Sequence, residues 1–161
     1  MFLSKERGRL GRTALLAGIV ACASFAVTGA QAGECPADQT KPDIRSPVDL
    51  KPVGVTDTVI ATIDVDKEQA IKDRSLRMRK LVIEPGGIVP WHSHGERPAI
   101  IYIVEGEIEE YASNCAVPIV HKAGEAVAET KGISHWWKNI GDKTVVLLSA
   151  DLLKDPNDHT M

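Results

Sequence analysis

The sequence predicts a small all-β domain, a β-sandwich or jelly roll, and three observations support this fold class. At least seven short apolar or β-branched segments follow one another between residues 58 and 151, and most are separated by glycine-containing turns. No long stretch has a helical period, and 161 residues suit one domain. Both phenylalanines, Phe2 and Phe25, precede the expected domain, so Val, Ile and Leu must form most of its core.

Residues 1–32 have the pattern of a secretory signal peptide. Four basic side chains in residues 5–12 precede an apolar, small-residue run at 13–30, and Ala-Gln-Ala follows. We expect cleavage after Ala32 and a periplasmic or secreted protein. A membrane anchor is less favoured because the run is short and interrupted by polar residues. Lipidation at Cys22, in a loose lipobox, ranks second to cleavage after Ala32.

The net charge argues against a nucleic-acid partner. Removing residues 1–32 takes away four basic residues and one acidic residue, which changes the formal charge from −3 to −6. The basic residues between 74 and 80 are interleaved with others, as on a solvated strand face. We therefore expect a small-molecule substrate or ligand, no nucleic acid and no membrane span after cleavage.

An extended arm is expected at residues 33–56, where four prolines exclude a helix. The arm carries Cys35, and Cys115 lies in the domain. In an oxidising compartment the two could form a disulfide, which the chain-entropy model values at about 4 kcal/mol. The alternative is that Cys115 is a catalytic or metal-binding thiol.

The expected domain covers residues 57–154 and a tail covers 155–161. A short helix or turn is expected at 67–74, and a turn at Pro85-Gly86-Gly87. Segment 99–104 is apolar on both faces, as in a central strand, and the acidic positions of 107–112 are expected to face water. The expected strands are 58–64, 76–84, 88–94, 99–104, 107–112, 117–121, 125–129, 134–139 and 144–151.

A metal site is predicted where His92 and His94 lie one residue apart on a strand. Side chains two apart point the same way, so both imidazoles can face one ion. Neutral imidazole suits zinc, copper, iron and nickel. Of the remaining histidines, His135 is the best third ligand, because His121 has no comparable context and His159 lies in the polar tail.

Two patterns here resemble the cupin superfamily, in particular its small single-domain, quercetin-dioxygenase-like members. The first cupin motif, G-x5-H-x-H-x(3,4)-E-x6-G, is matched by Gly86, His92, His94 and Gly106. The second, G-x5-P-x-G-x2-H-x3-N, is matched at the positions Gly124, Gly132, His135 and Asn139, with Thr130 in place of proline. The resemblance implies a cupin jelly-roll barrel and a metal held by His92, His94 and His135.

One departure from the family pattern changes the expected site. Ala99 stands where cupins have a glutamate ligand, and its methyl group cannot coordinate a metal. Glu96 could serve as a fourth ligand but lies three residues too early. Three-histidine cupin sites occur among Fe(II) dioxygenases, so the resemblance implies Fe(II), with Zn, Mn, Ni or Cu as alternatives.

The residues around the predicted site have open roles. Strand alternation from His135 sends Trp137 and Asn139 inward, and alternation from Ala99 turns Tyr102 away from the cavity. Trp137 is expected to line a pocket or pack in the core or a dimer interface, and Asn139 to tie down a turn. Arg97 could anchor a substrate carboxylate or pair with a glutamate at the rim. Arg97 and Glu96 are therefore the candidate catalytic residues.

These observations leave three function classes. The first is an exported, metal-dependent, dioxygenase-like enzyme acting on a small carboxylate or diketone. The second is a non-catalytic metal- or ligand-binding cupin, favoured by the shortage of acid–base residues. The third is a metal-free β-sandwich with packed histidines. The family resemblance also implies a homodimer.

Overall fold

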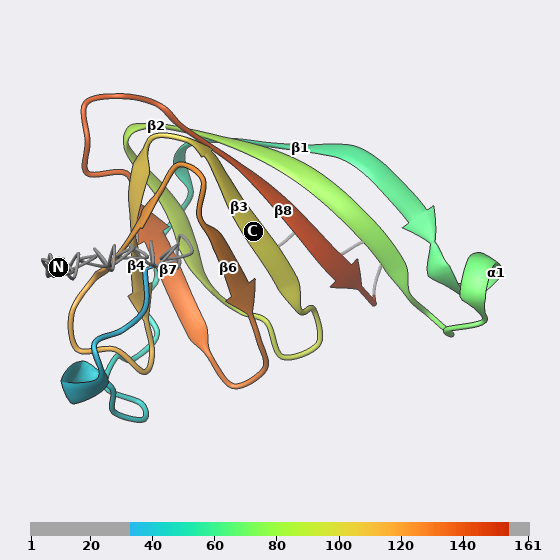
Figure 1. Cartoon of the computed structure of the whole chain (residues 1–161), viewed down its shortest axis with the longest axis horizontal. Helices are drawn as coiled ribbons and strands as arrows, with labels where there is room; N and C mark the ends of the chain where they lie inside the picture. The colour runs from blue at the N-terminus through green and yellow to red at the C-terminus, as the bar shows by residue number, and fades with distance from the viewer. Residues whose placement is uncertain (1–32, 155–161) are drawn as a thin grey trace, which may run out of the picture.

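A computed structural model describes residues 33–154 and shows an antiparallel β-protein (Figure 1). The described chain has a short 3-10 helix, η1 (Ala37–Gln39), and a short α-helix, α1 (Val65–Gln69). Neither helix of this part is long and apolar enough to cross a membrane. The strands are β1 (Val53–Asp64), β2 (Ser75–Ser93), β3 (Ala99–Glu105), β4 (Glu107–Ala112), β5 (Ile119–Lys122), β6 (Ala126–Glu129), β7 (Ser134–Lys138) and β8 (Val145–Leu153).

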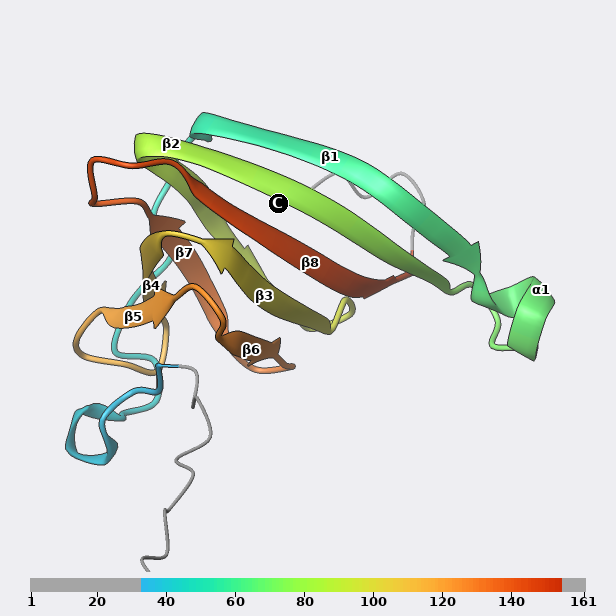
Figure 2. The same ribbon diagram turned by 45° about the horizontal axis from the view of Figure 1, so that its top comes forward.

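One curled sheet contains all of these strands. Its order is β5-β4-β7-β2-β8-β3-β6, and β1 pairs with β2. Every pair is antiparallel. The sheet bends round so that β4, β5 and β7 face the layer of β2, β8 and β3 (Figure 2). This arrangement confirms the predicted all-β jelly roll.

The extended arm ends, and the first strand begins, earlier than the sequence suggested. β1 begins at Val53, where Val53 and Val55 pair with Ile88 and Ile83 of β2. At the other end, α1 begins at Val65, two residues before the expected helix or turn, and stops at Gln69 because Ala70 adopts a left-handed conformation (φ 54°). β1 and the first part of β2 extend beyond the other strands, with α1 at their far end (Figure 1).

The predicted turn at Pro85-Gly86-Gly87 is wrong, because β2 runs through it without a break. The chain stays paired there: Gly86 donates its N–H to Asn139 O (2.9 Å), and Asn139 N–H donates to Gly87 O (3.0 Å). A Cβ at Gly87 would lie 2.7 Å from Glu84 O and from an Ile83 methyl carbon. The glycines therefore let the strand bend and pack closely rather than reverse.

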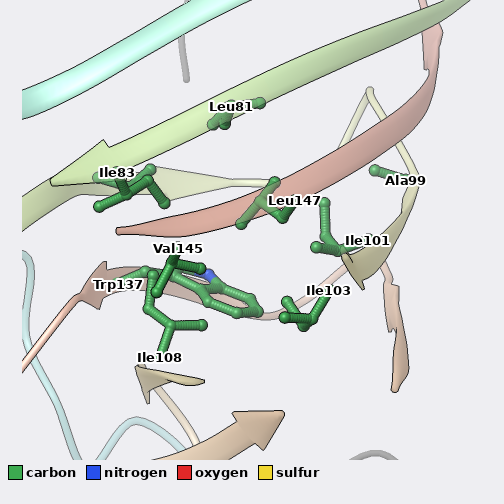
Figure 3. Packing of buried hydrophobic residues seen from close by; sticks show 10 residues of the cluster. Leu81, Ile83, Ala99, Ile101, Ile103, Ile108, Trp137, Val145 and Leu147 are labelled. Atoms are coloured by element: carbon green, nitrogen blue, oxygen red, sulfur yellow. The ribbon is translucent and has the colours of Figure 1, made fainter. Parts of the chain in front are cut away.

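The hydrophobic core is formed by residues of β2, β3, β4, β7 and β8. In Figure 3 the Trp137 ring lies among Ile103, Ile108 and Val145. Trp137 is buried, as predicted from its parity with His135. The other core residues are aliphatic, as the composition predicted, and comprise Leu81, Ile83, Val89, Ala99, Ile101 and Leu147.

β3 is buried on one face only, which corrects the expectation of a strand covered on both sides. Ala99, Ile101 and Ile103 point inward and are buried. Ile100 and Tyr102, on the outer face, are 59% and 44% exposed. Tyr102 thus points away from the interior, as predicted, and no described segment covers the outer face of β3.

A disulfide joins Cys35 of the arm to Cys115, as the sequence suggested. Further contacts hold the arm at the same place. Thr40 forms a β-bridge with Cys115, and the Arg45 side chain donates to Cys115 O (2.8 Å) and Ala116 O (2.9 Å). The arm is therefore fixed to the domain by covalent and polar contacts. The expected signal peptide and the tail, with His159, lie outside the described residues.

Candidate metal site

The structure brings His92, His94 and His135 together inside the curled sheet. His92 lies near the end of β2 and pairs directly with His135 of β7. His94 follows β2 and is 2% exposed, and His135 is fully buried. Strand pairing, rather than closeness in sequence, therefore completes the set of three imidazoles.

The Nε2 atoms of the three histidines converge. His135 Nε2 lies 3.2 Å from His92 Nε2 and 3.2 Å from His94 Nε2. Two nitrogens bound to one ion at about 2.1 Å would be about 3.0 to 3.4 Å apart at octahedral or tetrahedral angles. The spacing of these atoms therefore fits a divalent transition metal.

Each imidazole is oriented by a hydrogen bond from its other ring nitrogen. His92 Nδ1 donates to Pro90 O (2.8 Å), and His94 Nδ1 donates to Arg97 O (3.0 Å). His135 Nδ1 donates to Glu110 Oε1 (2.6 Å). With the proton on Nδ1, each neutral ring presents its Nε2 lone pair to the shared point. A divalent cation at this point could be bound by all three lone pairs.

The surroundings keep two of the rings neutral. Burial, and then the neighbouring His135, lower the pKa of His92 to about 2 and that of His94 to about 4. Burial alone would also lower the pKa of His135, but the Glu110 hydrogen bond and the nearby Glu129 charge raise it. Each neutral imidazole is a ready metal ligand.

Glu110 and His121 support the site and were not predicted. Glu110 is 5% exposed, which contradicts the expectation that its strand's acidic positions face water. Its Oε2 accepts from His121 Nε2 (2.8 Å), while its Oε1 accepts from His135. Burial alone would raise the pKa of Glu110, but these two bonds lower it to about 2. The sequence contained one indication that Glu110 is buried: it lies between Ile108 and Ala112 on the same face of β4.

Glu129 is a second buried carboxylate beside the histidines. It is 4% exposed, and its Oε2 lies 3.3 Å from His135 Nδ1 and 3.9 Å from His94 Nε2. Its Oε1 is buried and has no hydrogen-bond partner among the described residues. Burial, only partly offset by the charge of His135, raises the pKa of Glu129 to about 7.

A small cavity is lined by the three histidines. Arg79 contributes the guanidinium in its wall. Arg79 donates to Asp57 Oδ2, and its buried Nε forms no hydrogen bond but lies 3.6 Å from the carboxylate oxygen Oδ2 of Asp151. The other lining residues, mostly apolar, are Leu81, Val89, Ile101, Trp137, Leu147 and Ser149.

The two candidate catalytic residues lie elsewhere. Arg97 is buried but donates to Asp151 Oδ2 (3.0 Å), so its guanidinium is paired with a carboxylate from β8 and not with a rim glutamate. The Glu96 side chain is 70% exposed and lies 3.5 Å from Lys154 Nζ and 3.9 Å from Arg74. Neither side chain lines the cavity at the histidines.

Asn139 fastens the turn after β7, as expected. Its Nδ2 donates to Ile83 O (3.0 Å) and Lys143 O (2.7 Å), and its Oδ1 accepts from Gly141 N–H (3.0 Å). These bonds hold the end of the strand that carries His135 against β2. Asn139 therefore acts on the site through the backbone.

One protein family matches the part of the chain that carries the site. Residues 79–151 match the Cupin_2 family, described as a cupin domain. This range contains His92, His94, His135, Glu110 and Glu129.

Among curated proteins, the chain is similar to Nectarin-1 from Nicotiana langsdorffii x Nicotiana sanderae. The two are 27% identical over 123 residues, which cover 72% of this chain and 53% of the relative. The chain is also 27% identical over 106 residues to germin-like protein subfamily 2 member 2 from Arabidopsis thaliana, with 62% and 48% covered. The chain thus spans about half the length of the curated relatives it matches.

Solved structures show the same fold at low identity. A predicted oxalate decarboxylase from Thermotoga maritima superposes with a TM-score of 0.50 and 19% identity, covering 71% of this chain and 97% of that one. The Cnp3 cupin domain of Schizosaccharomyces pombe gives a TM-score of 0.51 with 15% identity and 66% of each chain covered. Both likenesses concern the fold alone.

Proposed function

Because residues 79–151 match the Cupin_2 family, we propose that the chain is an exported, metal-dependent, dioxygenase-like enzyme that acts on a small carboxylate or diketone. The observation that carries this proposal is the convergence of three Nε2 lone pairs beside a small, mostly apolar cavity. His92, His94 and His135 would hold the ion. When bound, Fe(II), the metal we favour, would supply redox chemistry and open positions for dioxygen and substrate.

The residues of the cavity have distinct tasks in this proposal. The guanidinium of Arg79 lines the cavity and attracts the substrate carboxylate by its charge, while its Nη1 donates to Asp57 and its Nε lies 3.6 Å from Asp151 Oδ2. Trp137 and Leu81 exclude water from the reacting groups. The Nδ1–H bonds to Pro90, Arg97 and Glu110 hold the three rings in place.

The export part of the proposal rests on the signal pattern of residues 1–32 and on the disulfide. A disulfide between Cys35 and Cys115 persists in the periplasm or outside the cell, and cytosolic thiols usually stay reduced. Fractionation of cells that produce the full-length chain tests this point. An intact amino terminus and a cytosolic location would contradict it.

Non-catalytic metal or ligand binding is the second candidate, and one observation favours it. The described residues lining the cavity include no carboxylate that could act as a general acid or base. Oxygen uptake separates the two functions. The purified protein, loaded with Fe(II) or Mn(II), is offered small carboxylates, oxalate included, and diketones.

We expect oxygen consumption that stops on metal removal and returns on reloading. Bound metal without turnover of any of these compounds would contradict the enzyme proposal and leave the binding function.

A further inference from the structure

We propose that Glu129 supplies the carboxylate ligand of this metal site. Glu129 lies on the strand next to Ala99, and Ala99 occupies the position at which cupins carry their glutamate ligand. The inference rests on the proposed metal site and deepens it. It changes the expected ligand set from three histidines to three histidines and one carboxylate.

Strand pairing places Glu129 and Ala99 together. Ala99 of β3 is the direct partner of Glu129 of β6. Directly paired residues of an antiparallel sheet point to the same face, with Cβ atoms about 4.5 to 5.5 Å apart. Both residues are buried, at 6% and 4% exposure, so both point inward. The small methyl group of Ala99 therefore leaves room that the longer Glu129 side chain can enter.

The Glu129 carboxylate lacks the partners that a buried charge requires. Oε1 accepts no hydrogen bond from any described residue. Oε2 faces His135 Nδ1 at 3.3 Å, but that nitrogen carries a single proton, and Glu110 Oε1 lies closer, at 2.6 Å. Glu110 therefore orients His135, and the Glu129 carboxylate needs a cation or a proton to offset the cost of burial.

The position of Glu129 is within reach of the ion. Oε2 lies 3.9 Å from His94 Nε2. Two ligand atoms with bonds of about 2.1 Å to the same ion can be at most about 4.2 Å apart. The second carboxylate oxygen, Oε1, accepts no hydrogen bond from the described residues, so the side chain can turn towards the three nitrogens without losing one there.

Charge supports the same assignment. Three neutral imidazoles leave the two positive charges of a divalent ion uncompensated in a buried site. One carboxylate reduces this net charge to +1, which stabilises the bound ion. Among the described residues, Glu110 is already committed to two histidines, so Glu129 is the available carboxylate.

Metal titration of a small set of variants tests the proposal. The purified protein, Glu129→Gln, Ala99→Glu/Glu129→Ala and the control Glu96→Gln are titrated with Mn(II) by calorimetry and with Co(II) by visible absorption. Glu96 is a matched control because it is an exposed carboxylate close to His94 in sequence. Unfolding temperatures are recorded with and without metal.

We expect Glu129→Gln to bind Mn(II) at least about 10-fold more weakly, with a changed Co(II) spectrum. The metal-free variant should unfold no earlier than the parent, because an unpaired buried charge has been removed, but its stabilisation by metal should shrink. The double variant should regain affinity, because it restores a carboxylate at the usual cupin position. Glu96→Gln should bind within about twofold of the parent.

The outcomes separate the two proposals. No metal uptake by the parent protein would overturn both the proposed function and this inference. Parent and Glu129→Gln binding with equal affinity and the same Co(II) spectrum would overturn the inference alone. A weaker Glu129→Gln whose Co(II) spectrum is unchanged, and which the double variant does not rescue, would assign Glu129 a supporting contact and also overturn it.

Discussion

Two buried polar clusters lie inside the same curled sheet, and they differ in how their charges are balanced. In the arginine cluster, defined as Arg77, Arg79, Arg97, Asp57 and Asp151, each carboxylate faces at least one guanidinium. The Asp151 carboxylate accepts two hydrogen bonds from Arg77, at 2.7 and 3.0 Å, and one from Arg97, at 3.0 Å. In the histidine site, defined as His92, His94, His135, Glu110 and Glu129, three Nε2 atoms converge and Glu129 Oε1 has no hydrogen-bond partner among the described residues.

The difference separates a structural cluster from a binding site. Oppositely charged groups that satisfy one another hold strands together and need nothing further. Buried imidazole and carboxylate acceptors that face one point need a cation there to offset the electrostatic cost of burying them. The arginine cluster should therefore affect mainly the free energy of unfolding, and the histidine site mainly metal affinity.

The largest expected change in the free energy of unfolding comes from a substitution in the arginine cluster. Asp151→Asn removes the carboxylate that joins β2 and β8 through Arg77. We expect it to lower the free energy of unfolding by about 3 to 5 kcal/mol, measured in urea. Metal stoichiometry of the folded fraction should not change. A loss below about 1 kcal/mol would show that the pairing contributes no more than a surface ion pair.

Removing the disulfide should separate stability from metal binding. The variant Cys35→Ser/Cys115→Ser frees the arm and should cost about 2 to 4 kcal/mol of unfolding free energy. Neither cysteine touches the histidines, so metal affinity at a temperature where the variant is folded should match the parent. Weaker metal binding by the folded variant would mean that the arm takes part in the site.

Glu110→Gln should have the opposite effect to the disulfide variant, because it should weaken metal binding more than it lowers stability. It takes away the carboxylate that orients His135, while an amide of the same shape remains. We expect metal affinity to fall about 10- to 100-fold, as for other outer-shell partners of metal ligands, and metal-free stability to change less than in Asp151→Asn. Unchanged affinity in a metal titration would remove Glu110 from the account of the site.

A smaller expected effect is that the two clusters make the free energy of unfolding depend on pH in different pH ranges. The pKa values of His92 and His94 are lowered to about 2 and about 4, so below about pH 6.5 the unfolded chain binds protons that the folded metal-free protein does not. Stability should therefore fall as the pH drops from about 6.5 towards 4. His135, with a raised pKa, stabilises below about pH 6.5 and loses this contribution as the pH rises through its folded value.

The arginine cluster should respond at lower pH. Burial alone would raise the pKa of Asp151, but the hydrogen bond from Arg77 and the charge of Arg79 lower it. Its contribution is present above about pH 3.8 and is lost below that value as the carboxylate takes up a proton. Urea unfolding of the metal-free parent, His94→Gln and Asp151→Asn across this range checks both steps. The same pH profile in all three proteins would contradict the assignment.

Local pattern was enough to predict most of the strands and the three histidines. Alternation put His92 and His94 on one face, and motif spacing added His135. Glu110 and Glu129 were missed because their roles depend on strand partners distant in sequence: Glu110 reaches His135 across β4 and β7. A buried carboxylate on a strand looks like a solvated one until the register is known.

The arrangement of the arginines could not be predicted for the same reason. Arg97 points inward, but its partner Asp151 is 54 residues away on β8. Glycine and proline suggested a turn at residues 85–87, whereas pairing with Asn139 keeps this segment within β2. Tertiary pairing decided each of these cases against the local signal.

The central claim is that the three histidines bind a transition metal, and elemental analysis tests it most directly. The purified protein, prepared without chelators, is compared with a His135→Ala variant that has been checked for folding. We predict near-stoichiometric iron or another transition metal in the parent and a loss of most of it in the variant. No metal in the parent, and none taken up on reconstitution, would contradict the account.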